Sequence, residues 1–231
     1  MFKYILVFYF VMTQEKKLRK VLPLVALLGL TNTTLANECK SQISVETANS
    51  FITQTGMMSS DEVIIQPKLG IKCGNFKGYS TIIDRVNGQT DRYVIGGIGI
   101  LPINSSNLTL RGGFDNLHIS KKEKDIPRFR IGGTLKGEIN LDFDYFKFLD
   151  RTEKSFLEWN INKKLKLDDN LDIYGKIGGT FNEGFTVDNR YYGEIGMNYN
   201  LNNSTSIFTI YQKQFEPIEN EQIRFGIKYN L

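Results

Sequence analysis

Apolar and polar residues alternate along most of the chain after residue 36. Residues 222–231 read QIRFGIKYNL, in which the odd positions from Ile223 to Leu231 are apolar. A period of two places alternate side chains on opposite faces of a β-strand. Clear segments of this kind lie at 128–136, 139–145, 157–162, 172–181, 190–199 and 222–231, and weaker ones at 42–53, 62–73, 76–86, 91–101, 106–117 and 205–213. The pattern predicts an all-β chain of about twelve strands, with ten as the alternative count.

The connections between these segments alternate between short turns and longer polar loops. The short ones lie near 73–75, 103–107, 136–138, 167–170 and 200–204, and the longer ones near 53–62, 86–92, 119–127, 149–155, 182–190 and 214–221. Outer-membrane barrels have short periplasmic turns and longer external loops. A closed barrel also leaves no strand edge exposed to lipid. We therefore expect an up-and-down antiparallel transmembrane β-barrel in the outer membrane of a Gram-negative bacterium. A soluble secreted barrel is the alternative, because it gives the same alternation.

The first 36 residues have the layout of a secretory signal peptide. Four basic residues between 16 and 20 precede the apolar run 21–30, and small residues at Thr34 and Ala36 offer a cleavage site. We expect a signal peptide over 1–36, with Met12 as an alternative start, and a single barrel domain over 37–231. The segment after Ala36 carries 24 basic and 24 acidic residues, since five of the 29 basic and one of the 25 acidic residues precede it. This balance gives no reason to expect a nucleic-acid partner.

Two cysteines, Cys39 and Cys73, are present in a chain that we expect to be exported. A disulfide is the default for such a pair outside the cytoplasm. In the barrel topology Cys39 precedes the first strand and Cys73 stands at the turn between the second and third, so both lie at the periplasmic rim. The sequence has no CxxC or HxxxH spacing. We therefore predict one disulfide, no metal site and no cofactor.

If the apolar face of each strand meets lipid, the polar face is the lumen. The charged residues that we expect to face the lumen and line the pore are Arg128, Arg130, Lys136, Glu138, Asp142, Asp144, Glu158, Asp172, Lys176, Arg190, Glu194, Arg224 and Lys228. Such charges can set the selectivity of a narrow channel, or they can pair across the interior and brace it shut. Both possibilities stay open at this point. The arginines at 128, 130 and 190 hint at attraction of anions.

The stretch IIQPKLGIKCGNFKGYSTIID at 64–84 resembles the early hairpin of the TorF-like family of small Gram-negative porins, in its Gln-Pro pair, its turn with Gly and Phe, and the aromatic residue of the next strand. The resemblance implies a twelve-stranded outer-membrane barrel that passes small polar solutes or ions. The family's Tyr-x-x-Arg-Gly element is replaced here by FITQTG at 51–56. Residues 222–231 also resemble the C-terminal signature of outer-membrane barrels. This implies contact with the barrel-assembly machinery, although Leu231 stands where an aromatic residue is common.

Two further functions remain as alternatives to a porin surrounded by outer-membrane lipid. A non-conducting, surface-exposed barrel would use its external loops for binding or adhesion. The pair His118 and Ser120 resembles the His-x-Ser element of outer-membrane lipid A 3-O-deacylases, which implies a hydrolase as a remote alternative. Lys121 replaces the usual Asn of that element, and the deacylase barrel is smaller. We therefore do not expect an enzyme.

Overall fold

The structure, a computed structural model, describes residues 39–49, 63–85, 90–103, 107–119, 124–150, 154–185, 188–216 and 219–231. Within these ranges the chain forms twelve β-strands and contains no helix long and apolar enough to span a membrane. The strands are β1 (Cys39–Ala48), β2 (Ile64–Cys73), β3 (Phe76–Arg85), β4 (Thr90–Ile103), β5 (Leu108–Ile119), β6 (Lys124–Leu135), β7 (Asn140–Phe148), β8 (Ser155–Lys166), β9 (Leu171–Glu183), β10 (Arg190–Asn200), β11 (Thr205–Glu216) and β12 (Asn220–Asn230).

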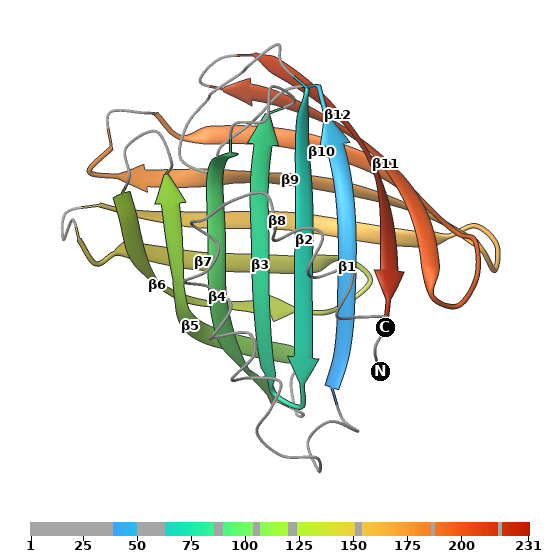
Figure 1. Cartoon of the computed structure of the whole chain (residues 1–231), viewed down its shortest axis with the longest axis horizontal. Coiled ribbons are helices and arrows are strands. Elements are labelled where there is room, and N and C mark those ends of the chain that lie inside the picture. Colours follow the sequence, from blue (N-terminus) through green and yellow to red (C-terminus); the bar gives the residue numbers. More distant parts are fainter. Residues whose placement is uncertain are drawn as a thin grey trace. The chain divides into compact units, whose positions relative to one another are not determined.

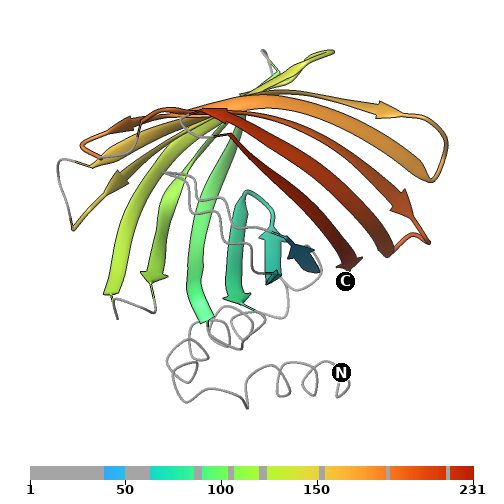
Figure 2. The same cartoon turned by 90° about the horizontal axis from the view of Figure 1, so that it is seen from above.

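The twelve strands form a closed up-and-down barrel, as the alternation predicts. Each strand pairs with its neighbours in the sequence, and the sheet curves around an interior (Figures 1 and 2). The barrel closes where β12 pairs antiparallel with β1, in a register that places Val45 opposite Ile227 and Ala48 opposite Arg224. The final alternating segment therefore completes the sheet and removes its open edge.

The two faces of the barrel wall differ in polarity, and β12 shows this most clearly. Phe225 is 59% exposed and Ile227 is 48% exposed, because both point away from the barrel. Gln222 is buried at 4% exposure on the opposite face, and Arg224 lines the interior. An apolar exterior with a polar interior is the arrangement of a barrel surrounded by lipid.

The connections differ from the expected pattern of long external loops. One end of the barrel, here called the turn end, carries the tight turns such as 136–139 and the end of β12. At the other, the loop end, the segments 86–89, 120–123 and 217–219 are as short as those turns, because the strands extend further than the apolar alternation indicated. The prediction of long external loops at these places was wrong. The topology that it supported is nevertheless the one observed.

Polarity inverts inside the barrel near the loop end. Ile126 of β6, Phe146 and Phe148 of β7 and Phe156 of β8 form a buried apolar cluster, whereas Lys147 between the two β7 rings is exposed. The rings of Phe146 and Phe156 stack with centroids 4.5 Å apart. An apolar interior behind a polar exterior is typical of sheet in contact with water. At the loop ends of β6–β8 the wall is therefore apolar inside and polar outside, as in a soluble barrel.

Both cysteines are oxidised, and the predicted disulfide is present. Cys39 at the start of β1 and Cys73 at the end of β2 are the only cysteines in the chain, and neither is free. The bond joins two strands at the turn end. It closes a loop of more than 30 residues, which includes the long β1–β2 connection.

Close approach of two strands requires glycine at position 113. A Cβ atom there would meet the backbone carbonyl oxygen of Gly97 on β4 and would lie 2.8 Å from the Cα atom of Ile98. We expect Gly113→Ala to lower the free energy of unfolding by about 1–3 kcal/mol, because backbone atoms of the sheet must move. Urea unfolding in detergent micelles measures this change. Gly70→Ala is the matched control, since nothing lies within 4 Å of its Cβ position. Equal destabilisation of both variants would contradict the prediction.

Candidate pore-lining site

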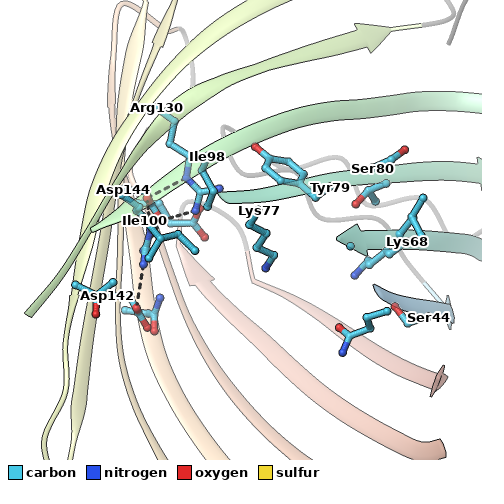
Figure 3. A pocket seen from close by; sticks show the side chains of 18 of the residues that line it. Ser44, Lys68, Lys77, Tyr79, Ser80, Ile98, Ile100, Arg130, Asp142 and Asp144 are labelled. Carbon is cyan, nitrogen blue, oxygen red and sulfur yellow. Dashed lines mark hydrogen bonds and ion pairs between the residues drawn. The ribbon is translucent and has the colours of Figure 1, made fainter. Parts of the chain in front are cut away.

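Described residues line two adjoining cavities in the barrel interior. The cavity nearer the turn end has a volume of about 590 Å³. Figure 3 shows Arg130, Asp142 and Asp144 grouped on one side of it, with Lys68 and Ser44 on the other. The cavity nearer the loop end has a volume of about 370 Å³ and is lined from every strand from β2 to β12. We refer to them as the turn-end cavity and the loop-end cavity.

One carboxylate on β7 holds two arginines on the wall of the turn-end cavity. Asp144 accepts bidentate hydrogen bonds from Arg111 of β5, with N–O distances of 2.7 and 2.6 Å. It also accepts bidentate bonds from Arg130 of β6, at 2.9 and 2.6 Å. Bidentate guanidinium–carboxylate pairs are among the strongest charge-assisted hydrogen bonds. Arg111 also lies 3.6 Å from a carboxylate oxygen of Asp142, so two arginines and two carboxylates form one group.

A second arginine–carboxylate pair lies next to the first, facing the loop-end cavity. Arg128 donates to Asp115 of β5 at 2.6 and 3.0 Å, and the two side chains are only 7% and 2% exposed. The hydroxyl group of Tyr79 on β3 donates to the same carboxylate at 2.8 Å. These contacts join β3, β5 and β6 across the polar interior. They also hold the Arg128 guanidinium over the ring of Phe146, 5.3 Å from its centroid.

A chain of ion pairs crosses the seam where the barrel closes. From β9 to β2 its members are Lys176, Glu194, Arg224, Glu46 and Lys68. The shortest links are those from Arg224 to Glu194, at 2.6 Å, and from Lys68 to Glu46, at 2.5 Å. The side chains of Glu46 and Glu194 are 4% and 6% exposed. The first and last strands are therefore joined by buried charges as well as by backbone hydrogen bonds.

The two cavities meet at a ring of five side chains that line both of them. These are Lys68 of β2, Tyr79 and Thr81 of β3, Arg130 of β6 and Glu158 of β8. Because they line both cavities, these groups lie where the two cavities adjoin. We call them the shared ring.

Cationic side chains outnumber carboxylates in the described lining of the two cavities. Among the described residues that line them, nine side chains are cationic and five are acidic. Glu46, which pairs with Lys68 from behind this lining, adds a sixth carboxylate.

The residues predicted to line the pore are distributed unevenly in the structure. Those that line the loop-end or the turn-end cavity are Arg128, Arg130, Asp142, Asp144, Glu158, Lys176, Arg190, Glu194 and Arg224. Asp172 is buried but pairs with Lys164 at 2.7 Å near the turn end. Lys228 is half-buried on β12 and lines neither cavity. A role in conduction stays a prediction for all of these residues.

Two of the predicted residues do not lie on a strand. Lys136 and Glu138 are exposed in the turn between β6 and β7. Lys136 ends the alternating segment 128–136, and Glu138 lies in the short turn predicted near 136–138. The short KGE stretch interrupts the pairing there, and both charged side chains are in contact with solvent at the rim.

Several interior residues were missed by sequence reasoning. They include Glu46, Lys68, Lys77, Arg92, Arg111 and Asp115. All lie in the first half of the barrel, where glycines and mixed polarity weaken the alternation. A usable signal did exist, because Arg111 and Asp115 are four positions apart on one strand and therefore share a face.

The hydrolase alternative rests partly on residues outside the described ranges. His118 is on β5, where its Nδ1 atom lies 2.9 Å from a carboxylate oxygen of Asp125 and its ring stacks on Tyr93 with centroids 4.5 Å apart. Ser120 lies outside the described residues, as does the predicted signal peptide. In the ranges that the structure describes, no group of three or more His, Cys, Asp or Glu side chains is placed to hold a metal ion.

Comparison with solved structures places the fold among outer-membrane porins. A structure of the KdgM porin matches 81% of this chain and 98% of its own length, with a TM-score of 0.61 and 12% sequence identity. The NanC porin matches 82% of this chain and 100% of its own length, with a TM-score of 0.63 and 7% identity. A second KdgM structure, in complex with disordered oligogalacturonate, has a TM-score of 0.58, covers 82% of this chain and 98% of its own, and shares 11% identity. At these identities the likeness establishes the fold.

No family model matches the chain. Among the curated proteins, none matches it either. The resemblance to the TorF-like porin family therefore stays a prediction, whereas the coarser likeness to porin barrels is shown by the fold.

Proposed function

We propose that this protein is a narrow outer-membrane channel of a Gram-negative bacterium that prefers small anions and anionic solutes. The observation that carries the proposal is the lining of two cavities that meet at the shared ring, in which nine cationic side chains face five carboxylates. Cationic walls with limited access to water raise the local concentration of anions and repel cations. The binding of oligogalacturonate, an anionic sugar chain, by the KdgM porin supports the same preference in a barrel of this fold.

The proposal includes the surroundings expected from the sequence. Residues 1–36 direct export and are removed, residues 37–231 form the barrel, and outer-membrane lipid covers its apolar exterior. Residues 222–231 are recognised by the barrel-assembly machinery. The exposed apolar side chains of β12 and the closed sheet support this assignment.

Reversal potentials in planar bilayers test the proposal. We expect discrete conductance steps and a reversal potential that indicates anion preference under a potassium chloride gradient. Arg130→Gln should lower the anion-to-cation permeability ratio by at least about twofold, since a unit charge a few ångströms from an ion changes its energy by about 1 kcal/mol even at high dielectric. Asp144 keeps Arg111 as a partner in this variant.

The matched control is Lys163→Gln, which removes the same charge from an exposed residue on β8. It stands three positions after Asn160, which lines the turn-end cavity, so strand alternation places its side chain on the outer face. The permeability ratio should not change in this variant. A cation-preferring wild-type channel would refute the proposal. A correctly folded barrel without conductance would instead favour the binding or adhesion role.

A further inference from the structure

A groove crosses the outer face of the barrel wall over the neighbouring strands β8 to β11 (Figure 1). It has a volume of about 600 Å³. The side chains that line it on the outer face are largely apolar, and they include Ile161, Ile177 and Phe215. These three residues are between 45% and 64% exposed, so no described part of the chain covers them. We call this hollow the outer-face groove.

Two glycines open the floor of the outer-face groove. Gly175 of β9 stands opposite Ile195 of β10, and Gly193 of β10 stands opposite Ile177 of β9. A Cβ atom at Gly175 would meet nothing within 4 Å, and one at Gly193 would meet only the ring of Phe215, at 3.4 Å. Close approach of the strands therefore does not require glycine at either position. The space above the two glycines is open to a molecule from outside the chain.

A lysine lies beside this open floor. Lys163 of β8 is exposed, lines the groove and stands directly opposite Gly175. No carboxylate among the described residues pairs with it. By contrast, Lys164 and Lys166 of the same strand each pair with an aspartate, at 2.7 and 2.8 Å. Because β8 ends at Lys166, the flexible side chain of Lys163 can extend toward the turn end and reach the level of lipid headgroups.

The combination of an apolar hollow and one cation matches the chemistry of a phospholipid. An acyl chain is apolar and fills the hollow, whereas the headgroup phosphate is an anion that attracts an ammonium group near the membrane surface. A second copy of this chain fits less well. It would bury Lys163 against apolar surface, which costs free energy unless a carboxylate accompanies the cation.

We propose that the outer-face groove binds an anionic phospholipid, with an acyl chain over Gly175 and Gly193 and the headgroup phosphate at Lys163. The inference rests on the proposed position of the barrel in an outer membrane, but it does not require conduction. In that position the turn end faces the periplasm, so the bound lipid belongs to the periplasmic leaflet.

Quenching of tryptophan fluorescence by brominated lipids tests the site. Trp159 is the only tryptophan of the chain and precedes Ile161 by two positions on β8, so both side chains share the outer face. The barrel is reconstituted in bilayers that contain brominated phosphatidylglycerol or brominated phosphatidylcholine at equal mole fractions. We expect the anionic lipid to bind near Trp159 with a relative affinity at least about threefold that of the zwitterionic lipid.

Three variants separate the charge from the hollow. Lys163→Gln should bring the two lipids to equal affinity, and Gly175→Leu should at least halve the preference because its side chain fills the groove. Lys147→Gln is the control, since it removes the same charge from an exposed residue of β7 near the loop end and should leave the preference unchanged. Lys163 is itself exposed, so its replacement should not impair folding.

Several results would overturn the proposal. One is equal quenching by the two lipids in the wild type, and another is an equal loss of preference in the Lys147 and Lys163 variants, which would indicate diffuse attraction. Full preference in Gly175→Leu would show that the groove takes no part. A dimer whose Trp159 is quenched by neither lipid would place a second copy on the groove. An anion channel without lipid preference would refute this inference alone, whereas lipid preference in a barrel without conductance would refute the channel and retain the site.

Discussion

Replacing Glu194 by glutamine should lower the free energy of unfolding of the barrel by about 3–5 kcal/mol, because it removes a buried carboxylate that pairs with two cations and leaves Arg224 with the more distant Glu46, at 3.9 Å. The Glu194 carboxylate lies 2.6 Å from Arg224 and 3.8 Å from Lys176, and it accepts a hydrogen bond from the Tyr174 hydroxyl at 3.1 Å. Its side chain is 6% exposed. Glutamine keeps the shape of the side chain but removes the charge, so packing changes little.

Urea unfolding in micelles, followed by tryptophan fluorescence, measures the effect. Asp169→Asn is the matched control, since Asp169 pairs with Lys166 but is 98% exposed. An exposed pair contributes less than about 1 kcal/mol. The double variant Glu194→Gln with Arg224→Gln should be less destabilised than the sum of its two single variants, because the cation that lost its nearest carboxylate is then absent. Similar losses in the Glu194 and Asp169 variants would show that the seam network does not support the closed barrel.

The alternation of apolar and polar residues was sufficient to predict twelve strands and their order. Backbone pairing in a barrel follows from a local signal, since each strand pairs with its neighbour in the sequence. The disulfide between Cys39 and Cys73 could be predicted for the same reason, because the topology places both residues at one rim. The lengths of the loop-end connections could not be predicted. Polar residues at strand ends continue to pair beyond the apolar belt, and composition alone does not separate them from loops.

The interior of the loop end was the part least accessible from the sequence. Asp142 and Asp144 were correctly placed on the polar face of β7, but Phe146 and Phe148 share that face. Assigning every polar residue to the lumen therefore fails at the loop end, where the wall extends beyond the lipid and apolar residues face the interior. The change occurs between Tyr145 and Phe146, two adjacent apolar residues that interrupt the alternation. Ion pairs in the lumen also join strands that are distant in sequence, as Glu46 and Arg224 do. Such pairs could not be predicted from the sequence.

The apolar cluster at the loop end gives the second large expected effect. Phe156 is 1% exposed, stacks on Phe146 at 4.5 Å between ring centroids and meets Phe148 at 6.1 Å. We expect Phe156→Ala to lower the free energy of unfolding by about 3–5 kcal/mol, through lost burial and the space that remains. Because Phe146 and Phe148 line the loop-end cavity, that space adjoins the proposed path of anions. Single-channel conductance should therefore rise in the same variant.

Two variants separate the contributions of burial and of pore width. Phe156→Leu keeps an apolar side chain in the cluster and should lose about 1–1.5 kcal/mol with little change in conductance. Phe225→Ala removes a ring that is 59% exposed on the outer face of β12, so it should leave conductance unchanged. If Phe156→Ala loses stability as expected but conducts like the wild type, the cluster stabilises the loop end without bordering the path of the ions. A rise in conductance with no loss of stability would mean that the ring obstructs the mouth without supporting it.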